Sequence, residues 1–329
     1  MKRWMMTLTF FFLFLSFSCI CQNTFIYAQS QYPSKPVNFL IGYPPGGLSD
    51  LTGRALAMAA EKALKQPIVV VNKPGASSSL QMVLLAQAKP DGYTIGSIAV
   101  SATVVMPLIE KMTYNPLKDF TYICNCFNYA PALVVRTDSP WRNFKEFVDF
   151  ARQNPGVVKY GTHGAYGTCT LVMEGLSKKL GVQWDTVPFK SDPAAVTALL
   201  GGHVTAAASP SNYAPHVRAG KLRILALMSP KRSPEFPEAP TLKDLGYDLV
   251  AEGFIGVAGP MGMPESIVRK LEEAFTQAVK DPAYLELLKQ LGLIEDYKNG
   301  KDFAKYVAGS FYQHDELIHK LGLDVSKLK

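Results

Sequence analysis

The stretch VNFLIGYPPGGLSDLTGRALAMAAEKALKQPIVVVN, residues 37–72, decides the fold. An apolar run over 37–43 predicts a strand, a loop over 44–49 follows, and helical periodicity extends from about 50 to 65. A second β-branched run, Ile68–Asn72, predicts another strand. Strand, helix and strand in this order are typical of a parallel pair joined by a right-handed crossover. The segment therefore predicts an α/β fold.

The same alternation continues outward and then restarts. A helix over about 78–89 and a strand over 93–100 complete a first unit. The second unit is expected to have strands at 132–136, 157–160, 184–188, 203–208 and 223–228 and helices at 143–153, 168–180 and 193–200. A strand at 254–258 and helices at 264–280, 283–291 and 303–321 close the chain.

The C-terminal helices have no sheet of their own, so we expect them to cover the first unit. The chain would then cross between two lobes twice, near 128–131 and 248–254, and form a double hinge. We predict an α/β protein of two lobes, each a mostly parallel sheet flanked by helices. Lobe 1 would contain residues 29–128 plus 251–329, and lobe 2 residues 129–250.

Composition agrees with two globular domains in 329 residues. Hydrophobic residues make up 48% of the chain and charged residues 19%, without blocks of one sign, which excludes a disordered or coiled-coil protein. The one long apolar run lies at the N-terminus, which excludes a polytopic membrane protein. The net charge of +7 is spread along the chain without basic runs, so no nucleic-acid partner is expected.

Residues 1–28 are typical of a secretory signal peptide. Lys2 and Arg3 precede an apolar stretch over 4–20, and no acidic residue occurs before Asp50. We expect cleavage after residue 28 and secretion of the mature chain. The alternatives are a single membrane-spanning anchor and a lipid anchor, and the bulky Phe17, two residues before the first cysteine, disfavours the lipid anchor.

Cysteine usage bears on the same question. The lipid anchor would be on Cys19 or Cys21, and the mature chain would keep Cys124, Cys126 and Cys169. Three sparse cysteines make no disulfide framework, and a chain of this length buries a core without one. Cys124 and Cys126 would share one face of a strand, so buried free thiols are expected.

The loop over residues 43–50 is the first candidate binding element. Its two prolines fix φ and have no N–H group, whereas the two glycines permit a tight turn. Free N–H donors would begin at Gly46 and continue into the start of the helix, which suits a carboxylate or phosphate. Asp50 would repel an anion, so we expect it to accept bonds from its own helix. The candidate ligand-binding residues are Tyr43, Pro45, Gly46, Gly47, Ser49 and Asp50.

A second loop, residues 161–168, also follows a strand and precedes a helix. Ligands of open α/β sheets bind at the carboxyl ends of strands, so two such loops facing one crevice would clamp an anion. A third strand-to-helix junction near 190 would add another edge. The candidates here are Gly161, Thr162, His163, Gly164, Tyr166, Thr168, Lys190 and Asp192.

Each of these features also has an ordinary structural explanation. One glycine-rich loop alone is commonly only a tight turn, and Ser49, Asp50 and Asp192 are also good helix caps. No hydrolase elbow, zinc, P-loop or dinucleotide motif occurs. His314 and His319 lie about 140° apart around their helix, so neither a metal site nor a cofactor is expected. Only the pairing of two loops favours binding.

Motifs in order along the whole mature chain resemble the Bug family, the extracytoplasmic solute-binding proteins of tripartite tricarboxylate transporters. The matching segments are YPSKP (32–36), GYPPGGLSD (42–50), NKPGA (72–76), PDGYT (90–94), YGTHG (160–164), VPFK (187–190), LGG (200–202), AGKLR (219–223), KRS (231–233), APT (239–241) and GP (259–260).

The resemblance implies a periplasmic, type 2, Venus-flytrap binding protein without catalytic activity or cofactor. It would capture a small organic carboxylate and deliver it to the membrane permease subunits of the transporter. The family holds a ligand carboxylate between the two loops, partly through bridging waters. The residues that this implies are Pro45, Gly46, Gly47 and Ser49, with Asp50 as loop organiser, opposite Gly161, Thr162, His163 and Gly164.

The second loop departs from the family pattern. Tyr166 stands where the third glycine of the family would be, and Thr170 where a histidine would be. A phenol there is expected to change the shape of the pocket, so the binding class carries over better than the identity of the ligand. Two other functions remain open: a secreted hydrolase or lyase using Ser49 with His163, and a ligand-loaded partner of a membrane sensor.

Overall fold

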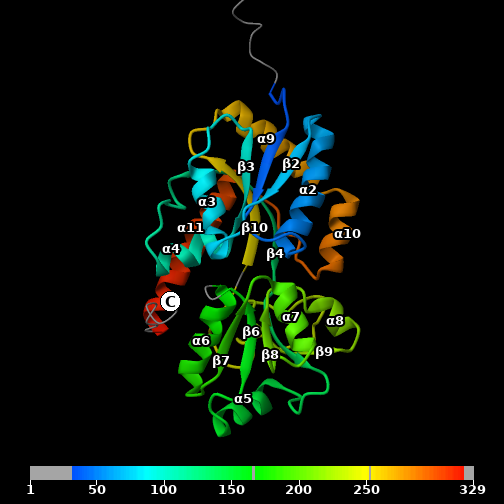
Figure 1. Ribbon diagram of the computed structural model, residues 1–329, viewed down its shortest axis with the longest axis vertical. Helices are drawn as coiled ribbons and strands as arrows, with labels where there is room; N and C mark the ends of the chain where they lie inside the picture. The colour runs from blue at the N-terminus through cyan, green and yellow to red at the C-terminus, as the bar shows by residue number, and fades with distance from the viewer. Residues whose placement is uncertain (1–31, 165–166, 252, 322–329) are drawn as a thin grey trace, which may run out of the picture.

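The computed structural model describes residues 32–164, 167–251 and 253–321, with side chains through 319, and it has two lobes (Figure 1). The sheet of the upper lobe contains β1 (Val37–Ile41), β2 (Ile68–Asn72), β3 (Thr94–Ala99), β4 (Phe120–Tyr129), β10 (Gly253–Pro260) and β11 (Lys298–Asn299). The sheet of the lower lobe contains β5 (Ala132–Arg136), β6 (Lys159–His163), β7 (Asp185–Phe189), β8 (Ala206–Ser209) and β9 (Leu222–Leu227).

The two sheets share one strand order. The upper sheet has the strand order β2-β1-β3-β10-β4-β11 and the lower sheet the order β7-β6-β8-β5-β9. In both sheets three parallel strands are followed by one antiparallel strand, β10 or β5, and then by a strand in the first direction; β11 is an additional edge strand of the upper sheet. Strand β10 is antiparallel to both β3 and β4, and β5 to both β8 and β9. As expected, most strands of each sheet run in the same direction. The sequence did not predict that β5, β10 and β11 run antiparallel to their neighbours.

Helices flank both sheets. In the upper lobe they are α2 (Leu48–Leu64), α3 (Ser79–Ala86), α4 (Met106–Ile109), α9 (Glu265–Ala278), α10 (Pro282–Gln290) and α11 (Gly300–Leu321), with a 3-10 turn η1 (Ala76–Ser78) and a π-helical turn η2 (Ser101–Val105). In the lower lobe they are α5 (Phe144–Gln153), α6 (Thr168–Leu180), α7 (Asp192–Leu200) and α8 (Ala214–Arg218).

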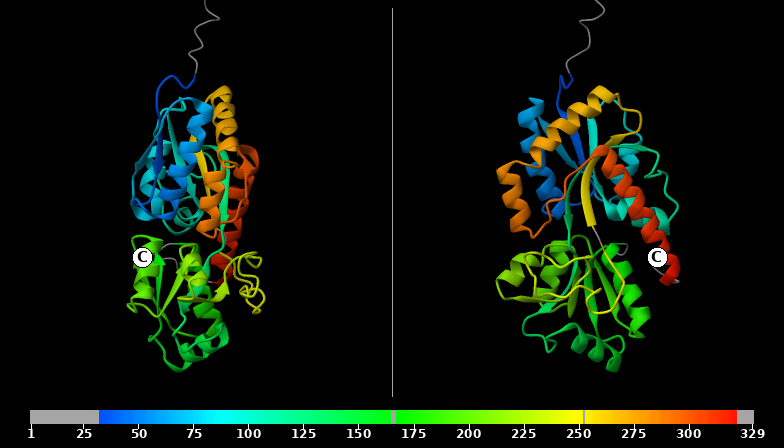
Figure 2. Two further views of the ribbon diagram at one scale, coloured as in Figure 1. Left: turned by 90° about the vertical axis from the view of Figure 1, so that its right-hand side faces the viewer. Right: turned by 180° about the vertical axis from the view of Figure 1, so that it is seen from behind.

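The C-terminal helices return to the upper lobe, as expected. Figure 2 shows α9, α10 and α11 on the back of this lobe, with the end of α11 beside the lower lobe. Phe275, Tyr284 and Phe303 from these helices are buried in the core that surrounds β1, β3 and β4. The predicted lobe boundaries stay a prediction, with the strand membership of the two sheets in their favour.

The lobes also touch beside the crossings. Val105, Met106 and Ile109 of the upper lobe form an apolar cluster with Leu171 of α6 and Ile318 of α11. This cluster joins the two lobes on the side of α4 and α6. The three cysteines that the structure describes are buried and free, as predicted.

The signal peptide predicted for residues 1–28, its cleavage site and the alternative anchors lie outside the described residues. Among the helices that the structure describes, none is long and apolar enough to cross a membrane.

The close packing around the central strand β10 predicts that a larger residue there lowers the stability of the protein. A Cβ at Gly256 would lie 2.4 Å from the backbone oxygen of Cys124 and 2.4 Å from the ring of Phe303. Gly256→Ala is therefore expected to lower the free energy of unfolding by about 1–3 kcal/mol. At Gly309, in α11, a Cβ meets nothing within 4 Å, so Gly309→Ala is expected to raise it by about 0.5–1 kcal/mol. Urea denaturation followed by circular dichroism measures both, and equal midpoints would contradict this packing.

Candidate functional site

The first loop ends at the N-terminus of α2. Gly47 is the N-cap, and its carbonyl accepts hydrogen bonds from the amides of Asp50 and Leu51 at 3.1 and 3.0 Å. The amides of Leu48 and Ser49 have no acceptor among the described residues. A helix N-terminus with free N–H groups carries partial positive charge and favours an anion. These two amides are the donors that the first loop offers.

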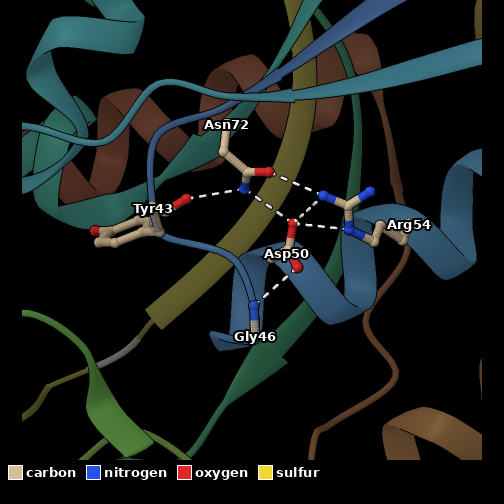
Figure 3. A network of polar contacts seen from close by, with 5 residues as sticks. All are labelled: Tyr43, Gly46, Asp50, Arg54 and Asn72. Carbon is tan, nitrogen blue, oxygen red and sulfur yellow. Dashed lines mark hydrogen bonds and ion pairs between the residues drawn. The ribbon is translucent and has the colours of Figure 1, made fainter. Parts of the chain in front are cut away.

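Asp50 fixes the shape of this loop. Its Oδ2 accepts a hydrogen bond from the Gly46 amide at 2.9 Å, and its Oδ1 accepts from Arg54 Nε at 3.0 Å and Asn72 Nδ2 at 2.9 Å (Figure 3). Asn72 Nδ2 also donates to the carbonyl of Tyr43 at 3.0 Å. The expectation that free donors begin at Gly46 is corrected, because this amide is bonded to Asp50. The contacts of Asp50 agree with its expected role as loop organiser.

The same contacts set the charge of Asp50. Burial alone would raise the pKa of its carboxyl, but hydrogen bonds from Arg54, Gly46 and Asn72 together outweigh burial, so the pKa lies below its usual range. Asp50 is therefore an ionised, fully bonded carboxylate at neutral pH. Its negative charge is already matched by Arg54 at 2.9 Å, which reduces the repulsion that an incoming anion would meet.

The second loop is built differently from the first. Strand β6 ends at His163, and the next residue, Gly164, has φ of 77° and donates its amide to the Phe189 carbonyl at 2.8 Å. A Cβ at Gly164 would lie 3.2 Å from Ser77 Oγ of the upper lobe, so glycine permits both the turn and the close approach of the lobes. The second loop thus contributes side chains, and the amide of Gly164 is not among its free donors.

Two polar side chains of the lower lobe, one buried and one half-buried, have a hydrogen-bonding atom that is not satisfied by the described residues. Asp192 Oδ2 accepts hydrogen bonds from the backbone amide and Nδ2 of Asn212 at 3.0 and 2.9 Å. Asp192 Oδ1 and His163 Nδ1 are buried without a partner among the described residues. Burial lowers the pKa of His163, and the nearby Asp192 carboxylate acts against that shift. His163 is therefore neutral at pH 7. Unpaired buried polar atoms of this kind are costly and often mark a ligand site.

The two loops meet at a small cavity, here called the inner cavity, of about 40 Å³. This volume holds roughly three water-sized groups, the size of a carboxylate head with a bridging water. The rings of Tyr43 and His163 face one another across the lobes, with centroids 6.5 Å apart. The described residues that line the inner cavity are Tyr43, Gly47, Leu48, Ser49, Ala99, Tyr129, His163, Ser191, Asp192, Pro210 and Ile255.

A larger space, the outer cavity, adjoins it at Tyr43 and His163 and has a volume of about 340 Å³. Its lining includes Lys190 and the η1 residues Ala76, Ser77 and Ser78, which all have positive φ, between 46° and 78°. Three consecutive non-glycine residues in this region store strain, which is typical of functional sites. The described residues that line the outer cavity are Gly42, Tyr43, Pro44, Pro74, Gly75, Ala76, Ser77, Ser78, His163, Gly164, Phe189 and Lys190.

Half of the fourteen candidate residues singled out in the sequence lie at these two cavities. Those that line one or both are Tyr43, Gly47, Ser49, His163, Gly164, Lys190 and Asp192. Those that line neither are Pro45, Gly46, Asp50, Gly161, Thr162 and Thr168. Tyr166 lies outside the described residues. The roles of all of them in ligand binding stay predictions.

The sequence analysis missed the contribution of η1 and of Tyr129. Segment 74–78, PGASS, directly follows β2, a strand parallel to β1, so its position at the same sheet edge could have been inferred. Tyr129 ends β4 next to the predicted crossing, where only the fold brings it to the cavity. Burial raises the pKa of Tyr43, a shift that its hydrogen bond with Ser101 partly offsets, so this phenol stays protonated and able to donate.

Comparisons with known proteins agree with this architecture. The model of the tripartite tricarboxylate transporter family receptor matches residues 52–323. A Cupriavidus necator protein, the UPF0065 protein in the gbd 5' region, is 39% identical over 299 residues, which cover 90% of this chain and 91% of that protein.

Solved structures extend the comparison to the fold. A TctC solute-binding protein from Polaromonas is 32% identical with a TM-score of 0.69, and the periplasmic binding protein BugD is 29% identical with a TM-score of 0.82. Each match covers 88% of this chain and 99% of the other. The predicted two-lobed periplasmic-binding-protein fold is thereby confirmed. The chain belongs to the tripartite tricarboxylate transporter receptor family and is a solute-binding receptor of the Bug type.

Proposed function

We propose that this receptor works in the periplasm, closes its lobes around a small organic carboxylate and delivers it to the membrane permease subunits of a tripartite tricarboxylate transporter. The observation that supports this most directly is the inner cavity. It joins the free amides of Leu48 and Ser49 on one lobe to His163 and Asp192 on the other. A ligand there bridges both lobes, so binding and closure are one event.

The donors present are sufficient for useful affinity without a metal ion. A micromolar dissociation constant corresponds to about −8 kcal/mol. Hydrogen bonds to a charged group contribute about 1.5–3 kcal/mol each, and a helix N-terminus adds about 0.3–1 kcal/mol. The amides of Leu48 and Ser49, the phenol of Tyr43 and the imidazole of His163 can together supply this. The rest of the ligand would occupy the outer cavity, near Lys190.

The contacts of His163 do not favour an enzyme. Nucleophilic catalysis by Ser49 would need His163 as base and an acid that orients the imidazole through Nδ1. His163 Nδ1 has no hydrogen-bond partner among the described residues, although Asp192 lines the same cavity. We therefore infer binding without turnover. A role as the loaded partner of a membrane sensor would use the same ligand site and differ only in the membrane protein that co-purifies with it.

A ligand panel tests the proposed function. Mono-, di- and tricarboxylates are added to purified protein with EDTA present, and the melting temperature and calorimetric affinity are measured. We expect at least one carboxylate to raise the melting temperature and bind with micromolar or lower dissociation constant, without consumption of the ligand. Native mass spectrometry of gently purified protein would identify any retained molecule. Unchanged melting across the panel would contradict the proposal.

His163 lines both cavities and provides a mutational test of the site. Replacing it in His163→Ala is expected to weaken binding of the best carboxylate about 10- to 100-fold, the loss of one hydrogen bond to a charged group. His203, an exposed residue before β8, is the matched control, and His203→Ala should leave affinity unchanged. Calorimetric titration measures both variants. Equal affinities for His163→Ala and wild type would place the ligand elsewhere.

Asp50 predicts a pH-dependent contribution to stability. Its pKa is lowered in the folded state, so its contribution is present above the unfolded pKa and is lost as pH falls through the folded pKa. Asp50→Asn is expected to cost about 1–3 kcal/mol at pH 7 and progressively less at acid pH. Exposed Asp149, paired with Lys145 and Arg152, is the control, since surface pairs stabilise little. Denaturant midpoints from pH 7 to pH 3 measure the difference, which a constant gap would refute.

A further inference from the structure

The carboxylate of Asp192 stands out in the inner cavity because only half of it is satisfied. Asp192 is 5% exposed, and both hydrogen bonds that it accepts, from the amide and side chain of Asn212, end on Oδ2. The other oxygen, Oδ1, is buried and has no partner among the described residues. The helix cap does not use it either, since the side chain that caps α7 is Ser191, which accepts from the Ala194 amide. Asp192 therefore has a free acceptor that helix capping does not explain.

The surroundings of Asp192 offer no cation for it. Among the described residues that line the inner cavity, none is Lys or Arg. His163 is the one imidazole in this lining, and burial lowers its pKa, so it brings no positive charge at pH 7. Lys190 is two residues away in the chain but lines the outer cavity. A ligand carboxylate at the α2 N-terminus would thus share the inner cavity with a second carboxylate.

Two carboxylates in one desolvated cavity repel each other unless a donor or a positive charge lies between them. The protein supplies donors for the ligand carboxylate, at Leu48 and Ser49, but none of the described groups donates to Asp192 Oδ1. A bound ligand can supply this donor. The inner cavity has a volume of about 40 Å³, which favours a donor close to the ligand carboxylate, and the neighbouring carbon is the nearest position that can carry one.

We propose that Asp192 selects carboxylates that carry their own hydrogen-bond donor, an ammonium or hydroxyl group, on the carbon next to the bound carboxylate. This inference rests on the proposed function and names the ligand class of the same site. The ligand carboxylate accepts from the α2 amides of the upper lobe, and its donor group reaches Asp192 Oδ1 of the lower lobe. Carboxylates of equal length without the donor leave Asp192 unpaired and bind less tightly.

Matched ligand triplets test this selection in the full-length mature protein. The probes are propanoate, lactate and alanine; succinate, malate and aspartate; glutarate, 2-hydroxyglutarate and glutamate. Calorimetry at pH 7.5 is expected to show at least tenfold tighter binding of the hydroxyl- or ammonium-bearing member in the triplet of suitable length. Within that triplet, the affinities of the amino acid and the hydroxy acid are compared. Tighter binding of the amino acid would identify an ammonium as the preferred donor, since it also neutralises the charge of Asp192.

The variant Asp192→Asn provides the second arm. Asparagine keeps an oxygen that accepts from Asn212, so folding is retained, and it removes the negative charge. We expect it to weaken binding of the donor-bearing member at least tenfold and to leave or improve binding of the donor-free member. Asp185→Asn, an exposed carboxylate at the start of β7, is the control and should change neither.

The outcomes separate the two proposals. If the donor-free acid binds wild type as tightly as its partners, or if Asp192→Asn weakens both equally, the selection by Asp192 is wrong while carboxylate binding stands. If no carboxylate in any triplet or in the wider panel binds wild type, the proposed function fails and this inference fails with it. The wild-type comparison needs no variant, so it decides the matter even if Asp192→Asn is unstable.

Discussion

The hydrogen bonds around Asp50 are the constraint on which the first half of the site depends. Pro44 and Pro45 remove two donors from the loop, and Asp50 takes the next one, the amide of Gly46. The Gly47 amide donates to the Pro44 carbonyl at 3.4 Å, so the first amides without an acceptor among the described residues are those of Leu48 and Ser49, on the first turn of α2. The carboxylate that would repel an anion instead shapes the loop, because Arg54 matches its charge and Asn72 donates a hydrogen bond to it before a ligand arrives.

The second half of the site uses the same topology for a different purpose. Both lobes have the same strand order, so the carboxyl ends of β1 and β6 reach one crevice, with Tyr43 and His163 facing each other. In the lower lobe the amide of Gly164 donates to the Phe189 carbonyl, and polar side chains line the cavity instead. One lobe thus offers backbone donors and the other offers an imidazole and a carboxylate. Under the proposed function, this asymmetry predicts that the lower lobe has the greater influence on which ligand is accepted.

Local patterns in the sequence predicted most of the fold, and they failed where tertiary contacts decide. Strand Ile68–Asn72, strand Ala132–Arg136 and helix Thr168–Leu180 agree residue for residue, because β-branched runs and helical periodicity are strong local signals. The antiparallel β10 was found as a strand but not as a central one, since strand direction is not encoded locally. Turns η1 and η2 were missed because positive φ at Ala76 and its neighbours follows from packing.

The candidate site was predictable at the level of its loops and not of its atoms. The strand-to-helix loops in the sequence singled out Ser49, His163 and Asp192, and all three line the inner cavity. The sequence does not show which backbone amides are free to bind a ligand, since the amides of Gly46 and Gly164 both donate to acceptors that only the fold brings close. Residue Asp192 could be a helix cap or a ligand contact from sequence alone. Its Oδ1, which has no partner among the described residues, and the capping role of Ser191 favour the ligand contact, which stays a prediction.

Closure has two contributions that act on different parts of the interface. The apolar cluster of Val105, Met106 and Leu171 favours contact between the lobes whether or not a ligand is present, because burial of apolar surface is not specific. The inner cavity acts in the opposite sense, since closing over it desolvates Asp192 Oδ1 and His163 Nδ1, two polar atoms that have no partner among the described residues. A ligand that satisfies these groups removes this cost and shifts the equilibrium to the closed state. The apolar cluster then stabilises closure in general, while the polar cavity decides which molecule is enclosed.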